Sequence, residues 1–325
     1  MNTPQAWHGL LVLNACVCLC AGAVCAQSYP AKTLRIVVGL APGGSTDVTA
    51  RIVGQKLAEE LGQTVVIENR TGAAGAIAAQ LVAVAPADGY TLLVVFNSHT
   101  ILQALRKDLS YNLARDFAPV SLMALGAAVL AVHPSVPARN VRQLIALARA
   151  NPAKLHYGSS GSGGTTHLMG ELFASLAQAK LAHIPYKGSS ENAMAVVGGQ
   201  IEIGFLDITA TLPLVSSGKL VPLAVTTLKR ALLMPTLPTL DESGLPGYDY
   251  AGWNGLSVPA AVPKDIVMRL NRAVERVVQA TATREALLKQ GMESQTGSPE
   301  QFAAFINAAG VKNAKLLALA GLKAE

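Results

Sequence analysis

The chain has 325 residues, of which 51% are hydrophobic, 5% aromatic and 14% charged, and its formal net charge is +6. A nucleic-acid-binding surface is not predicted, because the Lys and Arg residues are scattered and no basic run is interleaved with aromatic residues. The positive charge fits either a general attraction for small anions or an ordinary solvated surface.

An apolar stretch at residues 10–20 opens the chain, and small residues follow it, with Val24 and Ala26 where a signal peptidase requires them. We therefore expect residues 1–26 to be an export signal cleaved near Ala26, and the mature chain to be periplasmic. An N-terminal anchor and lipidation at Cys16 are the alternatives. All four cysteines lie in this segment, so the predicted mature chain has no disulfide, thiol nucleophile or thiolate metal site.

About 300 residues remain after cleavage, which is too many for one ordinary core and suits two domains. No later segment has the run of about 18 apolar residues that a membrane span needs, so we expect a soluble mature protein.

Apolar segments that predict strands alternate with amphipathic helical patterns along the predicted mature chain. The expected strands are 34–40, 64–67, 90–96, 127–132, 155–158, 182–185, 201–205 and 220–226. The expected helices are 46–61, 75–83, 141–150, 167–176, 263–281 and 299–319. This alternation predicts parallel-rich sheets that are covered by helices on both faces.

Two similar units recur in this pattern, each made of a strand, a loop rich in Gly, Ser and Thr, and an amphipathic helix. The first loop is Ala41-Pro42-Gly43-Gly44-Ser45-Thr46-Asp47, and the second runs from Ser159 to His167. A helix start leaves N–H groups unpaired and carries a partial positive charge, and glycine lets a ligand approach the backbone closely. Each loop can therefore bind an anion or simply cap its helix. Ligands in α/β sheets lie beyond the carboxyl ends of the strands, so the pair suggests a cleft between two lobes.

Three better-defined motifs fail at these loops. A P-loop needs a Lys after its last glycine, whereas Gly44 is followed by Ser45. The dinucleotide fingerprint fails because Thr166 stands where the third glycine belongs, and the nucleophile elbow fails because Ser162 replaces its final glycine. We therefore expect no nucleotide cofactor and treat a serine nucleophile at Ser45 or Ser162 as remote.

Three polar residues near strand ends each have two possible roles. Asp47 either interacts favourably with the helix dipole and local N–H groups, or more specifically shapes the first loop or meets an ammonium group of a ligand. His167 either donates a hydrogen bond to an anion or packs beside its helix, and without a nearby carboxylate or second His it is a poor metal ligand. Asp207, just after the strand at 201–205, either caps a loop or contacts the ligand. Other histidines are dispersed in sequence and predict no metal site: His99, His133, His156 and His183.

Taken in order, these stretches resemble the Bug family, the substrate-binding proteins of tripartite tricarboxylate transporters. Besides the first loop, the matching segments are Glu68-Asn69-Arg70-Thr71-Gly72-Ala73-Ala74-Gly75, Asp88-Gly89-Tyr90-Thr91-Leu92-Leu93, Tyr157-Gly158-Ser159-Ser160-Gly161-Ser162-Gly163 with His167, and His183-Ile184-Pro185-Tyr186-Lys187-Gly188. One departure is visible, because Thr71 and Ala74 stand where the family more often has Pro and Gly.

The resemblance implies an α/β, two-lobed periplasmic-binding-protein fold (type II-like), with parallel-rich sheets flanked by helices and a ligand cleft between the lobes. Lobe 1 would comprise residues 27–125 and 254–325, and lobe 2 residues 126–253. Family members bind small carboxylates, which the two loops hold from opposite lobes through backbone amides, hydroxyls and ordered waters. The predicted ligand-binding residues are Pro42, Gly43, Gly44, Ser45, Thr46, Asp47, Ser98, Ser159, Gly161, Ser162, Gly163, Thr165, His167 and Asp207.

These implications predict an extracytoplasmic receptor for a small carboxylate, either an organic acid or an amino acid. It would deliver the ligand to the membrane subunits of a tripartite tricarboxylate-type transporter. We expect a monomer that is not an enzyme and carries no metal or cofactor. One alternative is a ligand sensor that presents the bound solute to a membrane signalling protein. An exported serine hydrolase is the remote alternative.

Overall fold

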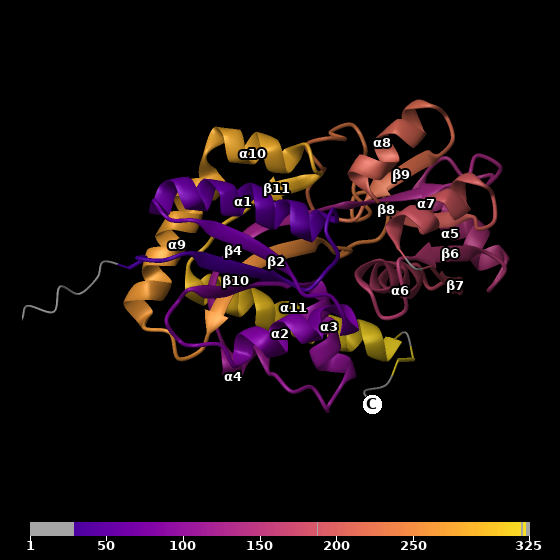
Figure 1. The fold of residues 1–325 in the computed structure, drawn as a ribbon. Helices are drawn as coiled ribbons and strands as arrows, with labels where there is room; N and C mark the ends of the chain where they lie inside the picture. Colours follow the sequence, from indigo (N-terminus) through magenta and orange to yellow (C-terminus); the bar gives the residue numbers. More distant parts are fainter. Residues whose placement is uncertain (1–28, 187, 320, 323–325) are drawn as a thin grey trace, which may run out of the picture.

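The computed structural model describes residues 29–186, 188–319, 321 and 322, and the predicted signal segment 1–26 lies outside these residues. Two sheets, each flanked by helices, form two lobes (Figure 1). This arrangement confirms the predicted two-lobed α/β fold. Among the described residues, no helix is both long and apolar enough to cross a membrane.

The sheet of the first lobe has six strands in the order β11-β4-β10-β3-β1-β2. Strands β2, β1 and β3 are parallel, as the strand–helix alternation predicts. Strand β10 is antiparallel to both β3 and β4, and β11 is antiparallel to β4. The strands are β1 (Leu34–Val38), β2 (Val65–Asn69), β3 (Thr91–Phe96), β4 (Phe117–Gly126), β10 (Gly252–Pro259) and β11 (Met292–Ser294). The helices of this lobe are α1 (Ser45–Leu61), η1 (Ala73–Gly75), α2 (Ala76–Ala83), α3 (Asn97–Leu105), α4 (Leu113–Asp116), α9 (Lys264–Gln279), α10 (Thr281–Leu288) and α11 (Pro299–Leu319).

The sheet of the second lobe has five strands in the order β7-β6-β8-β5-β9. Strands β7, β6 and β8 are parallel, and β5 is antiparallel to both of its neighbours. The strands are β5 (Ala128–Val132), β6 (His156–Ser159), β7 (Ala182–Pro185), β8 (Ile203–Asp207) and β9 (Val221–Val225). The helices are α5 (Val141–Ala150), α6 (Thr165–Ala177), α7 (Ser189–Val197) and α8 (Ile208–Ser216).

Alternating side chains of the first sheet fill two separate cores. Ile36 and Leu270 of α9 belong to the core on one face, and Val37 and Phe302 of α11 belong to the core on the other. All four side chains are at most 1% exposed. A strand places successive side chains on opposite faces, so a continuous apolar run is what a sheet covered on both faces requires.

Two crossings and one helix connect the lobes. The chain leaves the first sheet when β4 ends at Gly126 and returns when β10 begins at Gly252. Helix α11 extends past its own sheet to α6, so Leu316 and Leu317 join the core of the second lobe (Figure 1). Ile101 of α3 joins the same core. The two crossings are the places where the angle between the lobes can change.

Candidate ligand-binding site

Four helices begin where a central strand ends, at the edges of the two sheets that face each other. In the first lobe α1 follows β1 and α3 follows β3, and in the second lobe α6 follows β6 and α8 follows β8. Each helix start presents N–H groups that lack a partner within the helix, together with a partial positive charge. The fold thus directs several potential anion-binding groups towards the space between the lobes.

The first loop, residues 42–47, is named here the first jaw. Its helix begins at Gly44, which supplies no capping side chain, so the first N–H groups of α1 have no side-chain partner at that position. Gly43 has a φ of +86°, a conformation that L side chains rarely adopt. The stretch from Pro42 to Ser45 is exposed. The first jaw therefore offers accessible donors rather than a closed helix cap.

Asp47 holds the first jaw from behind. Its carboxylate is almost wholly buried and accepts hydrogen bonds from Gly43 N at 2.9 Å, Arg51 Nε at 2.9 Å and Asn69 Nδ2 at 2.8 Å. Burial raises the pKa of this carboxyl, but the bonds from Arg51, Gly43 and Asn69 outweigh burial and lower it. An ionised Asp47 consequently fixes the turn. Of its possible roles, this geometry supports local contacts with N–H groups and the shaping of the loop.

The segment that contains Gly75 packs against Gly39, which lies between β1 and the first jaw. A Cβ atom at Gly39 would lie 2.6 Å from Gly75 Cα, so only glycine fits at this contact. Gly75 belongs to the stretch Glu68 to Gly75, in which Thr71 and Ala74 depart from the Bug family pattern. Ala73 and Ala74 both have positive φ, of 46° and 52°. An alanine is strained in this conformation, which glycine adopts freely.

The loop at residues 159–167 is named here the second jaw. Its helix also begins at a glycine without a capping side chain, Gly164. The loop holds itself by internal bonds: Ser160 N donates to Thr166 Oγ1 at 2.9 Å, and Gly161 N donates to Ser159 Oγ at 3.2 Å. Ser162 is exposed at its tip. The second jaw thus repeats the first, with an open helix start and an exposed hydroxyl.

Two stacked histidines lie under the second jaw. Gly163 N donates to His167 Nδ1 at 2.9 Å, and Ser159 Oγ lies 2.6 Å from His183 Nε2. The His167 and His183 rings are parallel with centroids 3.7 Å apart. Burial, together with the neighbouring His167, lowers the pKa of His183 to about 4. The expectation that His167 has no second His nearby is wrong, because β7 pairs with β6 and brings the His183 ring onto it.

Glu171 and Tyr157 complete this cluster. Glu171 Oε1 accepts a hydrogen bond from Tyr157 Oη at 2.6 Å and lies 3.7 Å from His167 Nε2. Contact with His167 lowers the pKa of Glu171, and this effect together with the Tyr157 hydroxyl outweighs its burial. The expectation that His167 has no nearby carboxylate is therefore wrong. The i,i+4 spacing of His167 and Glu171 on one helix was the sequence signal from which this contact could have been predicted.

Asp207 and Ser98 lie at the two remaining strand ends. Asp207 occupies the N-cap position of α8, yet its side chain makes no capping bond and is exposed. Crowding by protein atoms raises its pKa, against a smaller lowering by Ser189. An exposed but crowded carboxylate indicates a concave position rather than an open surface. Ser98, the second residue of α3, is partly exposed.

Contacts on two sides bring the lobes together around the predicted site. A Cβ atom at Gly163 of the second jaw would lie 3.1 Å from Leu105 at the end of α3. On the other side, a Cβ atom at Gly291 in the first lobe would lie 3.3 Å from Thr209 Cγ2, two residues after Asp207.

Within the part of the chain that the structure describes, no group of three or more His, Cys, Asp or Glu side chains could hold a metal.

Comparison with known proteins identifies the family. Residues 49–322 match the model of the tripartite tricarboxylate transporter family receptor. The solved structure of R. palustris Rpa4515 with adipate is 34% identical, has a TM-score of 0.80, and covers 91% of this chain and 100% of its own. The periplasmic binding protein BugD is 30% identical, with a TM-score of 0.77 and coverage of 91% and 100%.

MatC (Rpa3494) from Rhodopseudomonas palustris with bound malate is similar at 28% identity, with a TM-score of 0.75 and coverage of 89% and 100%. The family consists of substrate-binding receptors and not enzymes, which excludes the serine hydrolase alternative. The chain belongs to the Bug family of tripartite tricarboxylate transporter receptors.

Proposed function

We propose that this chain is a periplasmic receptor that closes two lobes on a small carboxylate and delivers it to a tripartite tricarboxylate-type transporter. The observation that supports the ligand class is the pair of jaws: α1 and α6 both begin at a glycine N-cap without a capping side chain. Open helix starts bind anions. Rpa4515 and MatC are described with adipate and malate, both of which are dicarboxylates.

Binding at the jaws would proceed in two steps. In the open state the carboxylate would meet the amides and the Ser45 hydroxyl of the first jaw. Rotation at the crossings would then bring the second jaw, with Ser162 and Thr165, onto the same ligand. Asp47 and His167 would act from behind, because each accepts a hydrogen bond from a glycine of its own jaw. Ser98 and Asp207 would line the space between the jaws.

The division of the chain proposed from the sequence is residues 27–125 and 254–325 for lobe 1 and residues 126–253 for lobe 2. Strand β4 ends at Gly126 and β10 begins at Gly252, within two residues of the proposed boundaries. We propose that the receptor works as a monomer, because a single chain supplies both jaws.

A thermal-shift panel tests this function. The mature chain is mixed with adipate, malate, glutamate and benzoate, each over a range of concentrations. A ligand at 100 times its Kd stabilises the folded state by about 2.7 kcal/mol, so binding raises the Tm clearly. If carboxylates of every type leave the Tm unchanged, the proposed function is wrong.

A sensor that presents the bound solute to a membrane signalling protein would bind the same ligands. Uptake of the labelled ligand by a deletion strain separates the two. Loss of uptake supports delivery to a transporter. Normal uptake with a lost transcriptional response to the ligand supports the sensor.

A further inference from the structure

A cavity of about 730 Å³ lies at the hinge, and the proposed ligand site does not use it. Its walls come from both crossings, β11, α11 and residues 227–229 after β9. In the first sheet β11 lies on the opposite side of β4 and β10 from β1, and in the second sheet β9 lies on the opposite side of β5 from β6. The cavity therefore lies on the side of the two crossings that is away from the jaws, and none of the predicted ligand-binding residues lines it.

Lys229 gives this cavity an available positive charge. The side chain is exposed, lines the cavity, and makes no ion pair with any residue that the structure describes. The other cationic wall residue, Lys312, donates to Asp249 O at 2.8 Å and lies 3.6 Å from the carboxylate of Asp249. Glu293 accepts a hydrogen bond from Leu232 N at 2.9 Å. Lys229 is thus the wall cation that remains for a ligand.

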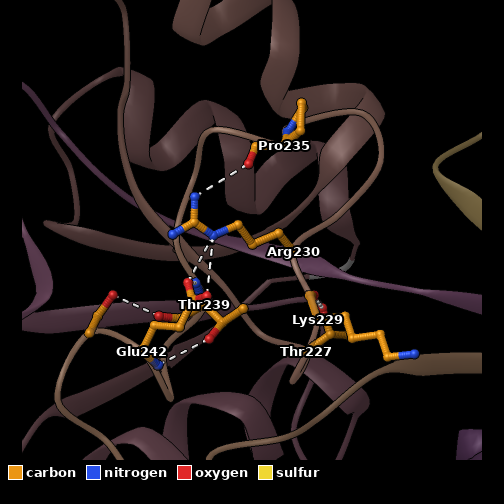
Figure 2. A network of polar contacts seen from close by, with 7 residues as sticks. Thr227, Lys229, Arg230, Pro235, Thr239 and Glu242 are labelled. Carbon is orange, nitrogen blue, oxygen red and sulfur yellow. Dashed lines mark hydrogen bonds and ion pairs between the residues drawn. The ribbon is translucent and has the colours of Figure 1, made fainter.

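A polar network holds the loop that carries Lys229 (Figure 2). Arg230 Nε donates to Glu242 Oε2 at 2.9 Å, and the same oxygen accepts a hydrogen bond from Thr239 N at 2.9 Å. Thr227 Oγ1 donates to Lys229 O at 2.8 Å, while the Lys229 side chain extends away from the network. A loop that is ordered before binding loses less entropy when a ligand arrives.

The rest of the wall combines an apolar patch with polar residues that include Asn97, Ser294, Gln295 and Asn313. Trp253 stands edge-on to Phe305 with ring centroids 5.3 Å apart, and both residues line the cavity beside Leu125 and Ala308. The buried Trp253 indole N–H has no acceptor among the described residues. This nitrogen has almost no accessible surface, so Trp253 contributes apolar ring surface to the wall and no donor.

We propose that the hinge cavity is a second binding site, which takes a monocarboxylate with a medium-length apolar chain. The carboxylate pairs with Lys229, and the chain packs over Phe305 and Ala308 beside Trp253. This ligand differs from the small carboxylate proposed for the jaws, because the jaws offer amides and hydroxyls whereas this wall offers an apolar patch of Leu125, Trp253, Phe305 and Ala308 beside a lysine. The volume is within the range of about 300–1,000 Å³ that is usual for small-molecule sites.

Octanoate is the probe, and the protein supplies its own reporter. Trp253 is the only tryptophan of residues 27–325, so the fluorescence of the mature chain reports on the cavity wall. We expect octanoate to change this fluorescence saturably. Lys229→Glu replaces an attraction with a repulsion and weakens octanoate binding about tenfold. Ala308→Phe places a ring where the apolar chain packs and weakens octanoate binding.

Two controls locate the site. Lys219→Glu makes the same charge change at an exposed lysine of the second lobe that does not line the cavity, and it leaves the octanoate Kd within about twofold. Ser45→Ala in the first jaw likewise leaves it unchanged. Thermal melting confirms that each variant folds. No saturable response, wild-type affinity in Lys229→Glu, or equal weakening in Ser45→Ala overturns the proposal. The first two outcomes leave the function proposed for the jaws unchanged, and the third places octanoate at the jaws.

Discussion

The imidazole rings of His167 and His183 stack face to face, with centroids 3.7 Å apart and planes 6° from parallel. Each ring also contacts the second jaw, His167 through Gly163 N and His183 through Ser159 Oγ. The stack therefore joins the loop to the neighbouring strand β7. A positive charge on His183 would lie against the neighbouring ring inside the fold, and burial with the nearby His167 lowers the pKa of His183.

The histidines make the stability of the fold depend on pH. Burial and the nearby His167 lower the pKa of His183 from 6.5 to about 4, and burial lowers that of His99 to about 4. As the pH falls below about 6.5 the unfolded chain binds protons that the folded chain does not, so stability is lost down to about pH 4. We expect the Tm to fall across this window, as measured by calorimetry.

His183→Gln isolates one part of this effect. The variant should show a shallower fall in Tm between about pH 6.5 and 4, because it lacks one group whose pKa differs between the two states. It should also be less stable at neutral pH, because the ring stack is lost. An identical pH profile in wild type and variant would mean that His183 does not titrate as proposed.

Replacing Asp47 tests whether it shapes the first jaw. Asp47→Asn keeps the size of the side chain but loses the charge that Arg51 pairs with, and one of its two acceptor oxygens becomes a donor facing Gly43 or Asn69. Leaving buried groups unsatisfied predicts a loss of about 2 kcal/mol in the free energy of unfolding. Urea denaturation measures it. Asp108→Asn, at an exposed carboxylate, serves as the control and should change little.

Ala74 is the position where a substitution should stabilise the protein. Its φ of 52° and ψ of 33° lie in the left-handed region, which costs an alanine about 1–2 kcal/mol. Glycine removes this strain at a smaller cost in chain entropy. We expect Ala74→Gly to raise the free energy of unfolding by about 0.5–1 kcal/mol. The same change at Ala76, which has a helical φ of −61°, should lower it.

Strong periodic patterns made much of the fold predictable. The helix Val141–Ala150 begins and ends as predicted, and Asn140 caps it through a 2.9 Å bond from Gln143 N. Strand β10 was not predicted, because Asn254, Gly255 and Ser257 interrupt its apolar pattern. A Cβ atom at Gly255 would lie 2.2 Å from the Phe302 ring, so the packing of α11 and not local propensity explains this glycine.

The geometry of the candidate site could be predicted where it is local in sequence and not where it depends on tertiary contacts. The two glycine-rich loops stood out because strand, loop and helix are adjacent in sequence. The stacking of His183 on His167 could not be predicted in this way, because it depends on the parallel pairing of β6 with β7, which places Tyr157 beside His183. The predicted capping role of Asp207 also remained open until the structure placed it at an N-cap without a capping bond.

The jaws themselves give the last prediction. Ser45 and Ser162 are exposed, and neither hydroxyl bonds to any residue that the structure describes, so removing them costs the fold little. A hydrogen bond to a charged ligand is worth about 1.5–3 kcal/mol, so each alanine variant should bind its carboxylate at least about tenfold more weakly. The free energy of unfolding should stay within about 0.5 kcal/mol of wild type.

Calorimetric titration with the best ligand from the thermal-shift panel measures the affinity, and urea denaturation measures the stability. Ser110→Ala, an exposed serine away from both jaws, is the matched control and should alter neither quantity. The N-cap residues Gly44 and Gly164 supply no capping side chain. If the serines served only to cap these helices, the alanine variants would lose stability without a specific loss of affinity. Parallel losses of stability and affinity would therefore reassign the serines to capping, whereas a loss of affinity alone supports the two-jaw site.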